Sequence, residues 1–213
     1  MALVICSSDQ AGNPSILSSA ERAQYAAFVN EAARQRFLTG RWLVRHVLAS
    51  GLGCSPESVP LTLAEGGKPI CPLPEAPQFN LSHAGRHVAA VFSTAGAVGV
   101  DIEDTGRNVN AAGIADRFFA PAEVKILADQ GPRGFFAIWT RKEAMLKAMG
   151  TGLTGAWSTL DTFASDWQFH TYGVGESMLA SVACHHSVPT LRNYRLTDDE
   201  QLVTFAPLFF STT

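Results

Sequence analysis

The segment from Val88 to Glu103 constrains the fold more than any other part of this 213-residue chain. It reads VAAVFS, then the turn-like TAGA, then VGVDIE, and two apolar runs around a short turn predict a buried β-hairpin. Side chains alternate along a strand, so Asp101 and Glu103 share one face and Ile102 lies on the other. Two such carboxylates repel each other or converge on a hard cation. Taken alone, an Asp-x-Glu pattern more often ends a strand at the surface, so the remaining sequence must decide.

Composition places the chain among globular proteins with a substantial core. Hydrophobic residues make up 46% and charged residues 16%, and the length suits one large domain or two small packed ones. The formal net charge of −3 argues against a general nucleic-acid binder. No run of eighteen apolar residues predicts a membrane span, and the start MALVICSSD lacks the features of a signal peptide. We expect a cytoplasmic protein with four reduced cysteines, and neither nucleic acid nor membrane among its partners.

The hydrophobic pattern along the chain predicts an α+β fold. Cap-type residues, glycines and prolines mark where helices begin and end, and Gly131-Pro132 separates two helices of the second half. In chain order we expect a strand at 2–6, helices from 19 and from 31 to 50, a strand at 79–83, the hairpin, helices within 108–119, 121–130 and 133–149, and antiparallel strands after 157.

A weak internal repeat suggests how these elements are organised. At an offset of 99 residues, four residues recur along two helices that glycines end: Phe37 and Phe136, Ala49 and Ala148, Gly51 and Gly150, Gly53 and Gly152. Chance is one explanation, because helices stopped by glycine are ordinary. The sharper interpretation is a tandem pair of similar α+β halves, residues 1–98 and 99–213, with a site at the seam between them.

The last predicted helix carries the second set of residues that suit catalysis. Glu143 and Lys147 are four residues apart and share a helix face, with Lys142 beside them. Such a set is usually a solvated ion-pair surface, but this helix has little other charge. Glu143 together with Asp101 and Glu103 would supply the oxygen ligands that one Mg²⁺ prefers.

Basic and polar side chains elsewhere fit a phosphorylated substrate. Lys68 lies in the glycine loop GGKP, which lacks the P-loop frame. His83 would bond a phosphate or handle a proton, and Ser82 would be a hydroxyl ligand or cap, since no G-x-S-x-G elbow surrounds it. The helix expected at 31–50 adds four arginines: Arg34, Arg36, Arg41 and Arg45.

In this order, the motifs GGKP, FNLSHAGR, GVDIE, RFFAPAE and WTRKEAMLKAMGTGL resemble those of the 4′-phosphopantetheinyl transferases. The resemblance covers roughly residues 34–160 and is to the longer, monomeric type that activates peptide and polyketide synthetases. It implies two similar α+β halves with the active site at their interface. The implied reaction is Mg²⁺-dependent: the 4′-phosphopantetheine arm of coenzyme A moves to a serine of an apo acyl, peptidyl or aryl carrier protein, and 3′,5′-ADP leaves.

The resemblance also implies roles for single residues. Asp101, Glu103 and Glu143 would bind Mg²⁺, and Glu143, Asp101 and Lys147 would be the catalytic residues. Contacts to the phosphates of coenzyme A are implied for Arg36, Arg41 or Arg45 and for Lys68, Ser82, His83, Lys142 and Lys147. The general base stays open between Glu143, a metal-bound water and His83. One departure is that residues 20–33 contain no lysine, so the lysine pair that the family carries there is missing.

Two other functions stay open on the residues themselves. One is a Mg²⁺-dependent phosphohydrolase or nucleotidyl transferase, and the other is a non-catalytic module that binds a carrier protein or a nucleotide. For a carrier protein, we expect docking at an apolar patch near the seam, around Phe118, Phe119 or Phe135. The alternative for each phenylalanine is burial in a core, where such side chains more often lie.

Overall fold

A computed structural model describes residues 1–8, 12–150, 157–185, 192–196 and 202–204. Its N-terminal elements are β1 (Ala2–Ser7), α1 (Ser19–Ala27), α2 (Glu31–Leu52), β2 (Thr62–Leu63), β3 (Pro69–Ile70), β4 (Gln78–Ala84) and β5 (His87–Ser93). The C-terminal elements are β6 (Val98–Asp104), α3 (Ala111–Phe118), α4 (Pro121–Met149), β7 (Gln168–Val174), β8 (Met178–Cys184), β9 (Arg192–Leu196) and β10 (Leu202–Thr204). Short 3-10 helices cover Pro14–Ile16, Pro56–Ser58, Glu65–Gly67 and Trp157–Thr159.

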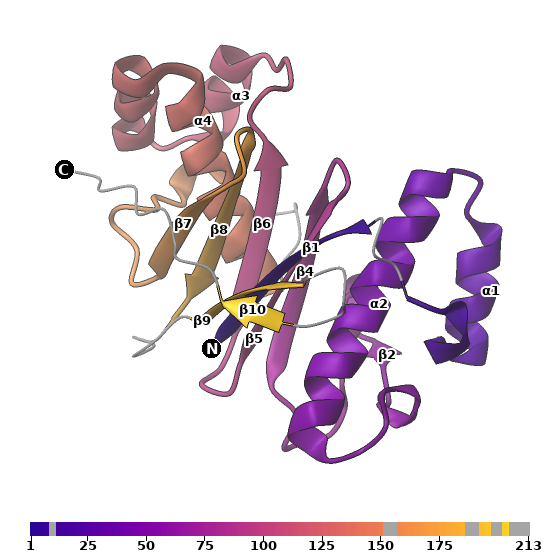
Figure 1. The fold of residues 1–213 in the computed structure, drawn as a ribbon. Helices are drawn as coiled ribbons and strands as arrows, with labels where there is room; N and C mark the ends of the chain where they lie inside the picture. The colour runs from indigo at the N-terminus through magenta and orange to yellow at the C-terminus, as the bar shows by residue number, and fades with distance from the viewer. Residues whose placement is uncertain (9–11, 151–156, 186–191, 197–201, 205–213) are drawn as a thin grey trace.

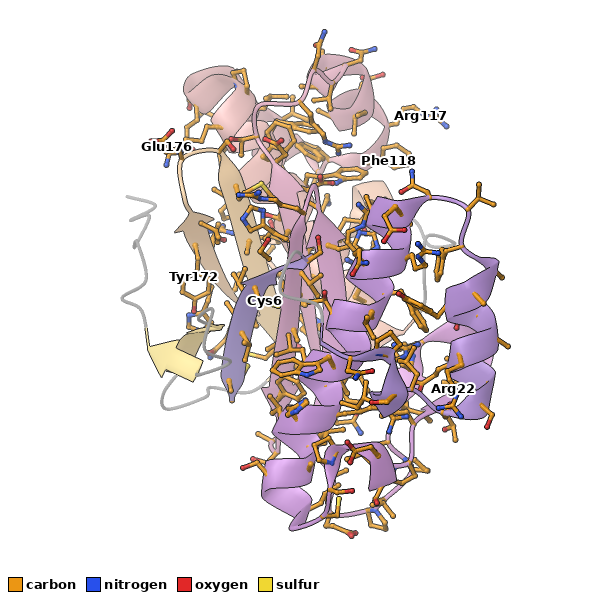
Figure 2. The ribbon with its side chains drawn as sticks, turned by 45° about the vertical axis from the view of Figure 1, so that its right-hand side comes forward. Cys6, Arg22, Arg117, Phe118, Tyr172 and Glu176 are labelled. Carbon is orange, nitrogen blue, oxygen red and sulfur yellow. The ribbon has the colours of Figure 1, made fainter. Side chains whose placement is uncertain are left out.

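Two sheets pack between two layers of helices (Figure 1). Apolar residues of α2 and of one face of the β1-containing sheet form the first core. The other face of that sheet packs on the sheet of β6, β7 and β8, and this second core holds Leu3, Ile5, Val100 and Ile102. Helices α3 and α4 cover the outer face of the second sheet. Figure 2 shows the side chains that fill these layers.

The two halves share one topology. The strands run in the order β1-β5-β4 in the first half and β6-β8-β7 in the second, all antiparallel. Each set consists of one strand, two helices and a hairpin in chain order. This arrangement confirms the predicted α+β fold of two similar halves. Strand β9 pairs in parallel with β1, so the end of the chain extends the N-terminal sheet, and the division at residue 98 stays a prediction.

The hairpin predicted for residues 88–103 is wrong. β5 pairs with β1 and β4, whereas β6 pairs with β8 in the other sheet. Both strands are largely buried because each sheet lies between helices and the other sheet, although β6 carries Asp101 and Glu103 on its helix-facing side. Such mostly apolar runs identify buried strands, but they do not specify which strand pairs with which.

β4 and β6 meet side by side at the seam between the sheets. The backbone N–H of Val100 donates to Asn80 Oδ1 at 3.1 Å, and that of Ile102 donates to Ser82 Oγ at 3.3 Å. Since both partners advance by two residues, the strands run in the same direction. Side chains of β4 therefore satisfy buried N–H groups of β6, which fixes the register of one half against the other.

The helix boundaries follow the predicted signals. Ser18 and Glu21 form a capping box at the start of α1, and α2 ends at Gly53, whose φ of 66° suits a left-handed cap. α4 breaks at Gly131 (φ 64°), as the Gly-Pro pair predicted, and is capped by Gly150. The repeat predicted that α2 ends before Gly51, but α2 continues through Gly51 to Leu52, so the 99-residue repeat is not exact. Gly152 lies outside the described residues.

Two of the three phenylalanines expected at a docking patch are buried. Phe119 and Phe135 are 4% and 0% exposed and belong to the core under α4, so that prediction is wrong for both. Phe118 is partly buried at the end of α3, next to the exposed Arg117 (Figure 2). Among the helices that the structure describes, none has the length and apolar character that a bilayer crossing requires.

Candidate functional site

Asp101 lies at the centre of a polar cluster at the seam. Its Oδ1 atom is 2.7 Å from Lys147 Nζ and accepts a hydrogen bond from Ser82 Oγ at 2.9 Å. Lys147 Nζ also donates to Ser82 Oγ at 2.9 Å. Three predicted site residues from β4, β6 and α4 therefore meet, although Asp101 is buried and not at the surface.

Gly99 allows this meeting. A Cβ atom on Gly99 would lie 1.9 Å from the carbonyl oxygen of Ala144 and 2.6 Å from the Ala148 nitrogen. No real Cβ atom approaches backbone so closely, so only glycine lets α4 lie this near to β6. The close approach brings Lys147 within reach of Asp101.

Glu103 is held at the other end of the β6 face. Its Oε1 atom accepts from Trp139 Nε1 at 3.2 Å and from Arg107 Nη2 at 2.9 Å. Burial raises the pKa of Glu103, and the negative charge of Asp101 raises it further. Glu103 and Asp101 thus share a face, as the strand alternation predicted.

Glu143 faces the same region from α4. Burial raises its pKa to about 7, the charges of Asp101 and Glu103 act in the same direction, and Lys147 opposes them. A carboxyl group with this pKa exchanges its proton near neutral pH, which suits a general acid or base. Mutual repulsion of the three carboxylates is the electrostatic signature of a site that favours a cation.

The three carboxylates fit a hard cation by their chemistry. Asp101 Oδ2 is buried and has no hydrogen-bond partner among the described residues, so it is free to coordinate. Among the described residues, no three Asp, Glu, His or Cys side chains lie close enough together to hold a metal ion in their present positions. A cation would therefore draw Glu103 and Glu143 toward Asp101, so its binding stays a proposal.

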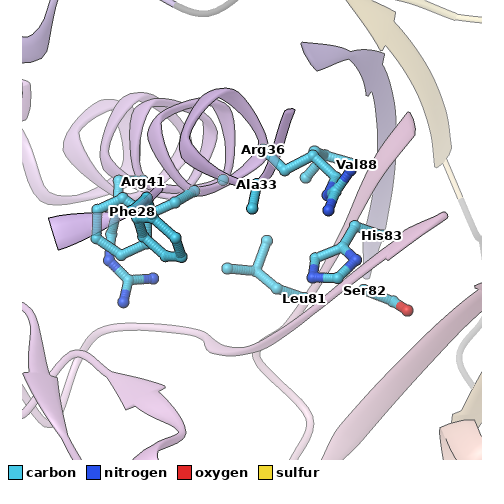
Figure 3. Close-up of a pocket in the computed structure, with 10 residues that line it drawn as sticks. Phe28, Ala33, Arg36, Arg41, Leu81, Ser82, His83 and Val88 are labelled. Carbon is cyan, nitrogen blue, oxygen red and sulfur yellow. The ribbon is translucent and has the colours of Figure 1, made fainter. Parts of the chain in front are cut away.

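A pocket of about 180 Å³ lies between α2 and β4, beside this cluster (Figure 3). Arg36, Arg41, Ser82 and His83 contribute its polar lining, and Leu81 and the phenylalanines of α2 and the preceding turn contribute apolar surface. Arg36 Nη1 donates to the carbonyl of Gly85 at 3.0 Å, which holds the guanidinium over the end of β4. A cationic pocket with apolar walls suits a phosphorylated heterocycle.

The imidazole of His83 is tuned by the same pocket. Burial lowers the pKa of His83, and the positive charges of Arg36 and Lys147 lower it further. His83 is therefore neutral at physiological pH in the free protein. A phosphate in the pocket would offset those positive charges and raise this pKa.

The other predicted arginines lie deeper. Arg41 Nε is 2.9 Å from Glu21 Oε1, and Arg45 Nη2 is 2.6 Å from Glu21 Oε2. Arg45 also donates to the carbonyls of Pro56, Glu57 and Val59. With 2% exposure and no share in the pocket lining, Arg45 joins α2 to its neighbours, and its implied contact with coenzyme A does not fit this position.

The two remaining lysines also differ in burial. Lys68 is half-buried and its Nζ lies 3.4 Å from the Lys147 carbonyl, so the glycine loop does reach α4. Lys142 is fully buried, and its Nζ is 2.7 Å from Glu123 Oε2. A contact between Lys142 and a coenzyme A phosphate does not fit this position, because the ammonium is closed off from any ligand.

Sequence reasoning assigned no role to several residues that shape the site. Asn80 and Trp139 position the β6 backbone and Glu103, and Glu123 is the partner of Lys142. Trp139 lies one helical turn before Glu143, which is a usable signal. Nothing in the sequence signals the role of Asn80, since its partner lies 20 residues away in the other half.

Comparisons with known proteins identify the family of both halves. A family model described as the 4′-phosphopantetheinyl transferase superfamily matches residues 97–197. A second model, described as the N-terminal part of 4′-phosphopantetheinyl transferase, matches residues 7–95. The two matches meet near residue 96, close to the seam between the halves.

Three curated relatives bear the corresponding names. A putative 4′-phosphopantetheinyl transferase of Synechocystis sp. is 37% identical over 150 residues, which is 68% of this chain and 61% of the relative. The transferase HetI of Nostoc sp. is 35% identical over 64% of this chain and 61% of its own. The transferase Sfp of Bacillus subtilis is 33% identical over 70% and 66%. The matched region spans about three fifths to two thirds of these relatives. By both of its halves, the chain belongs to the 4′-phosphopantetheinyl transferase superfamily, in its longer, two-domain form.

Proposed function

We propose that the protein transfers the 4′-phosphopantetheine arm of coenzyme A to a serine hydroxyl of an apo acyl, peptidyl or aryl carrier protein. The observation that carries this proposal is the meeting of Asp101, Ser82 and Lys147 at the seam, next to the pocket lined by Arg36 and His83. One half would hold the nucleotide end of coenzyme A, and the other would hold the pyrophosphate and the acidic residues.

In this proposal the carrier serine oxygen forms a bond to the β-phosphorus, and the bond from that phosphorus to the bridging oxygen of 3′,5′-ADP breaks. The serine proton goes to Glu143, a carboxylate that faces Asp101 and Lys147 and whose pKa burial raises in the metal-free protein. Lys147 donates hydrogen bonds to the pyrophosphate and stabilises the charge that develops there. Arg36 and His83 bind the adenosine 3′-phosphate, and Lys68 supports the glycine loop beside it.

Asp101, Glu103 and Glu143 would hold the Mg²⁺ that the resemblance implies. When bound, the ion acts as a Lewis acid on the pyrophosphate and balances its charge. The unpaired Oδ2 of Asp101 supports this assignment. In the free protein Lys147 partly balances the acidic residues, and a cation held by the carboxylates would leave the Lys147 ammonium available to the substrate.

The intact mass of an apo carrier protein tests this function. After incubation with the protein, coenzyme A and Mg²⁺, we expect the carrier to gain one phosphopantetheine arm. Omission of coenzyme A or of Mg²⁺ should prevent the gain. A thermal-shift assay provides the control: coenzyme A with Mg²⁺ should stabilise the protein more than ATP does. Equal protection by ATP, with no mass gain, would favour the phosphohydrolase or nucleotidyl transferase alternative.

A further inference from the structure

Glu123 and Lys142 form an ion pair closed to solvent inside the C-terminal half. Glu123 Oε2 and Lys142 Nζ are 2.7 Å apart, and both side chains are 0% exposed. Neither residue lines the pocket beside α2. An ion pair in such a position is costly to bury, so it calls for an explanation other than stability alone.

Every polar atom of this pair has a partner. The Glu123 carboxylate also accepts from the Ala120 N–H at 2.7 Å and from the N–H and hydroxyl of Thr162 at 2.9 and 2.8 Å. The three protons of Lys142 Nζ are directed to Glu123 and to the carbonyls of Trp157 and Leu160. A fully satisfied buried network holds one geometry, because any departure leaves a charge unpaired at low dielectric.

The pair joins three segments of the chain. Glu123 lies in the first turn of α4, Lys142 lies beyond the break at Gly131, and residues 157–162 supply the remaining partners. In a straight helix the two residues would be about 28 Å apart, at 1.5 Å per residue. Their contact therefore shows that α4 folds back at Gly131 and that the pair fixes the two parts against each other.

The geometry of a helix carries this restraint to the site. Lys142 immediately precedes Glu143, and successive helical residues are rotated by about 100°. With Lys142 fixed on the inner side, Glu143 and, one turn later, Lys147 are directed at β6, where Lys147 meets Asp101 at 2.7 Å. A rotation of this helix by a few tens of degrees would separate them.

We propose that Glu123 and Lys142 are positioning residues, whose buried pair sets the rotation of α4 and thereby places Glu143 and Lys147 against Asp101. Lys142 itself touches no phosphate. The effect on transfer rests on the function proposed above, whereas the effects on unfolding and on coenzyme A binding do not.

Three variants of the full chain test this role: Lys142→Met, Glu123→Gln and the double variant. We expect Lys142→Met to lower the unfolding midpoint, because it leaves the Glu123 carboxylate buried and unpaired. The double variant removes both charges and should recover most of that midpoint. Lys125→Met, at an exposed lysine of the same helix, is the matched control and should change nothing.

The functional measurements separate positioning from ligand binding. Isothermal titration with coenzyme A and Mg²⁺ gives Kd and the fraction of competent protein, and carrier mass gain gives kcat per binding site. We expect Lys142→Met to raise Kd several-fold, because Lys147 is displaced from the pyrophosphate, and to lose about tenfold or more in kcat, since small misplacement of catalytic groups has effects of this size. The Kd should return to the wild-type value in the double variant. Most of the kcat should return in the double variant.

Two results would overturn the proposal. A rise in Kd of about tenfold in both Lys142→Met and the double variant would make Lys142 a phosphate ligand. Equal midpoints for Lys142→Met and the double variant would show that the two charges are not coupled. If the wild-type protein binds coenzyme A but modifies no carrier, the proposed function fails, and the midpoint and Kd results still decide the role of the pair.

Discussion

The two halves share a topology but cover their sheets in different ways. In the first half the helix-facing residues of β1 are Val4 and Cys6, which pack in the apolar core beneath α2. In the second half the helix-facing residues of β6 are Gly99, Asp101 and Glu103, beneath α4. One fold therefore supports an apolar interface in one place and a charged site in the other, and the difference lies in the side chains.

The difference also shows what a charged interface requires. α2 keeps its buried ion pairs on the side facing α1, where Arg41 and Arg45 meet Glu21. α4 turns Glu143 and Lys147 toward its own sheet, and Gly99 lets it approach closely enough for contact. Closeness strengthens electrostatic interactions because it excludes water.

Loss of the central carboxylate should have the largest effect. We expect Asp101→Asn to lower transfer by about 10²–10³-fold, because the isosteric amide keeps the Ser82 contact but removes the charge that the site is built around. Carrier mass gain over time measures the rate. The matched change in the first half is Cys6→Ser, which should lower stability but leave the rate per folded molecule unchanged. An active Asp101→Asn variant would contradict the assignment of this face.

Filling the close approach should have the next largest effect. A Cβ on Gly99 meets backbone at 1.9 Å, so Gly99→Ala should cost about 2–4 kcal/mol of unfolding free energy and should also lower transfer. In the first half Gly40→Ala meets Leu81 at an ordinary 3.6 Å and should be neutral or stabilising by up to about 1 kcal/mol. Denaturant unfolding compares them, and equal costs would show that the halves pack alike.

Two arginines of α2 should separate binding from stability. Arg36 lines the pocket, so Arg36→Ala should weaken coenzyme A binding by about 10–100-fold with little effect on unfolding, as expected for a lost charge-assisted phosphate contact. Arg45 is buried against Glu21, so Arg45→Met should lower the unfolding midpoint more than it changes Kd in the folded fraction. Calorimetric titration measures Kd and thermal unfolding measures the midpoint of both variants. A larger loss of binding in Arg45→Met than in Arg36→Ala would contradict these roles.

The smallest effect should be a difference in pH dependence between two glutamates. Because the pKa of Glu143 is raised from 4.5 to about 7, its destabilising effect is absent below about pH 4.5 and grows as the pH rises to 7. After allowance for solvent screening, Glu143→Gln should add about 1–2 kcal/mol at pH 8 without Mg²⁺ and little at pH 4.5.

Glu21 should behave in the opposite way. Burial would raise its pKa, but the Ser18 amide and the two arginines outweigh burial and lower it. Its stabilising contribution is therefore present above pH 4.5 and is lost as the pH falls through the lowered pKa. Glu21→Gln should destabilise at pH 8, and unfolding curves at several pH values would show whether the two signs differ.

Much of the fold could be predicted from local sequence. The capping box at Ser18, the glycine caps and the break at Gly131 are short-range signals, and each lies within two residues of where it was expected. Strand partners could not be predicted, because β5 and β6 are both largely buried strands joined by a short turn, and their sequences would fit a hairpin equally well. Pairing depends on contacts between distant segments that no local pattern encodes.

The candidate site was also predictable only in part. The periods of strand and helix correctly predicted that Asp101 and Glu103 share a strand face and that Glu143 and Lys147 share a helix face. The sequence treated all the lysines and arginines as ligands, whereas the structure buries some of them away from the site. Lys142 and Arg45 look like ligands in a motif, yet each is enclosed by partners from other segments. The catalytic and binding roles of the remaining residues stay predictions.

By itself, the sequence determined the helices, the strands and the faces on which the charged residues lie, because these follow from backbone periodicity and local hydrogen bonding. Only the tertiary structure decided which strands pair, which cations face the pocket and which are neutralised inside the core. Those outcomes depend on desolvation and on the approach of segments far apart in the chain, and Gly99 and Asn80 control that approach.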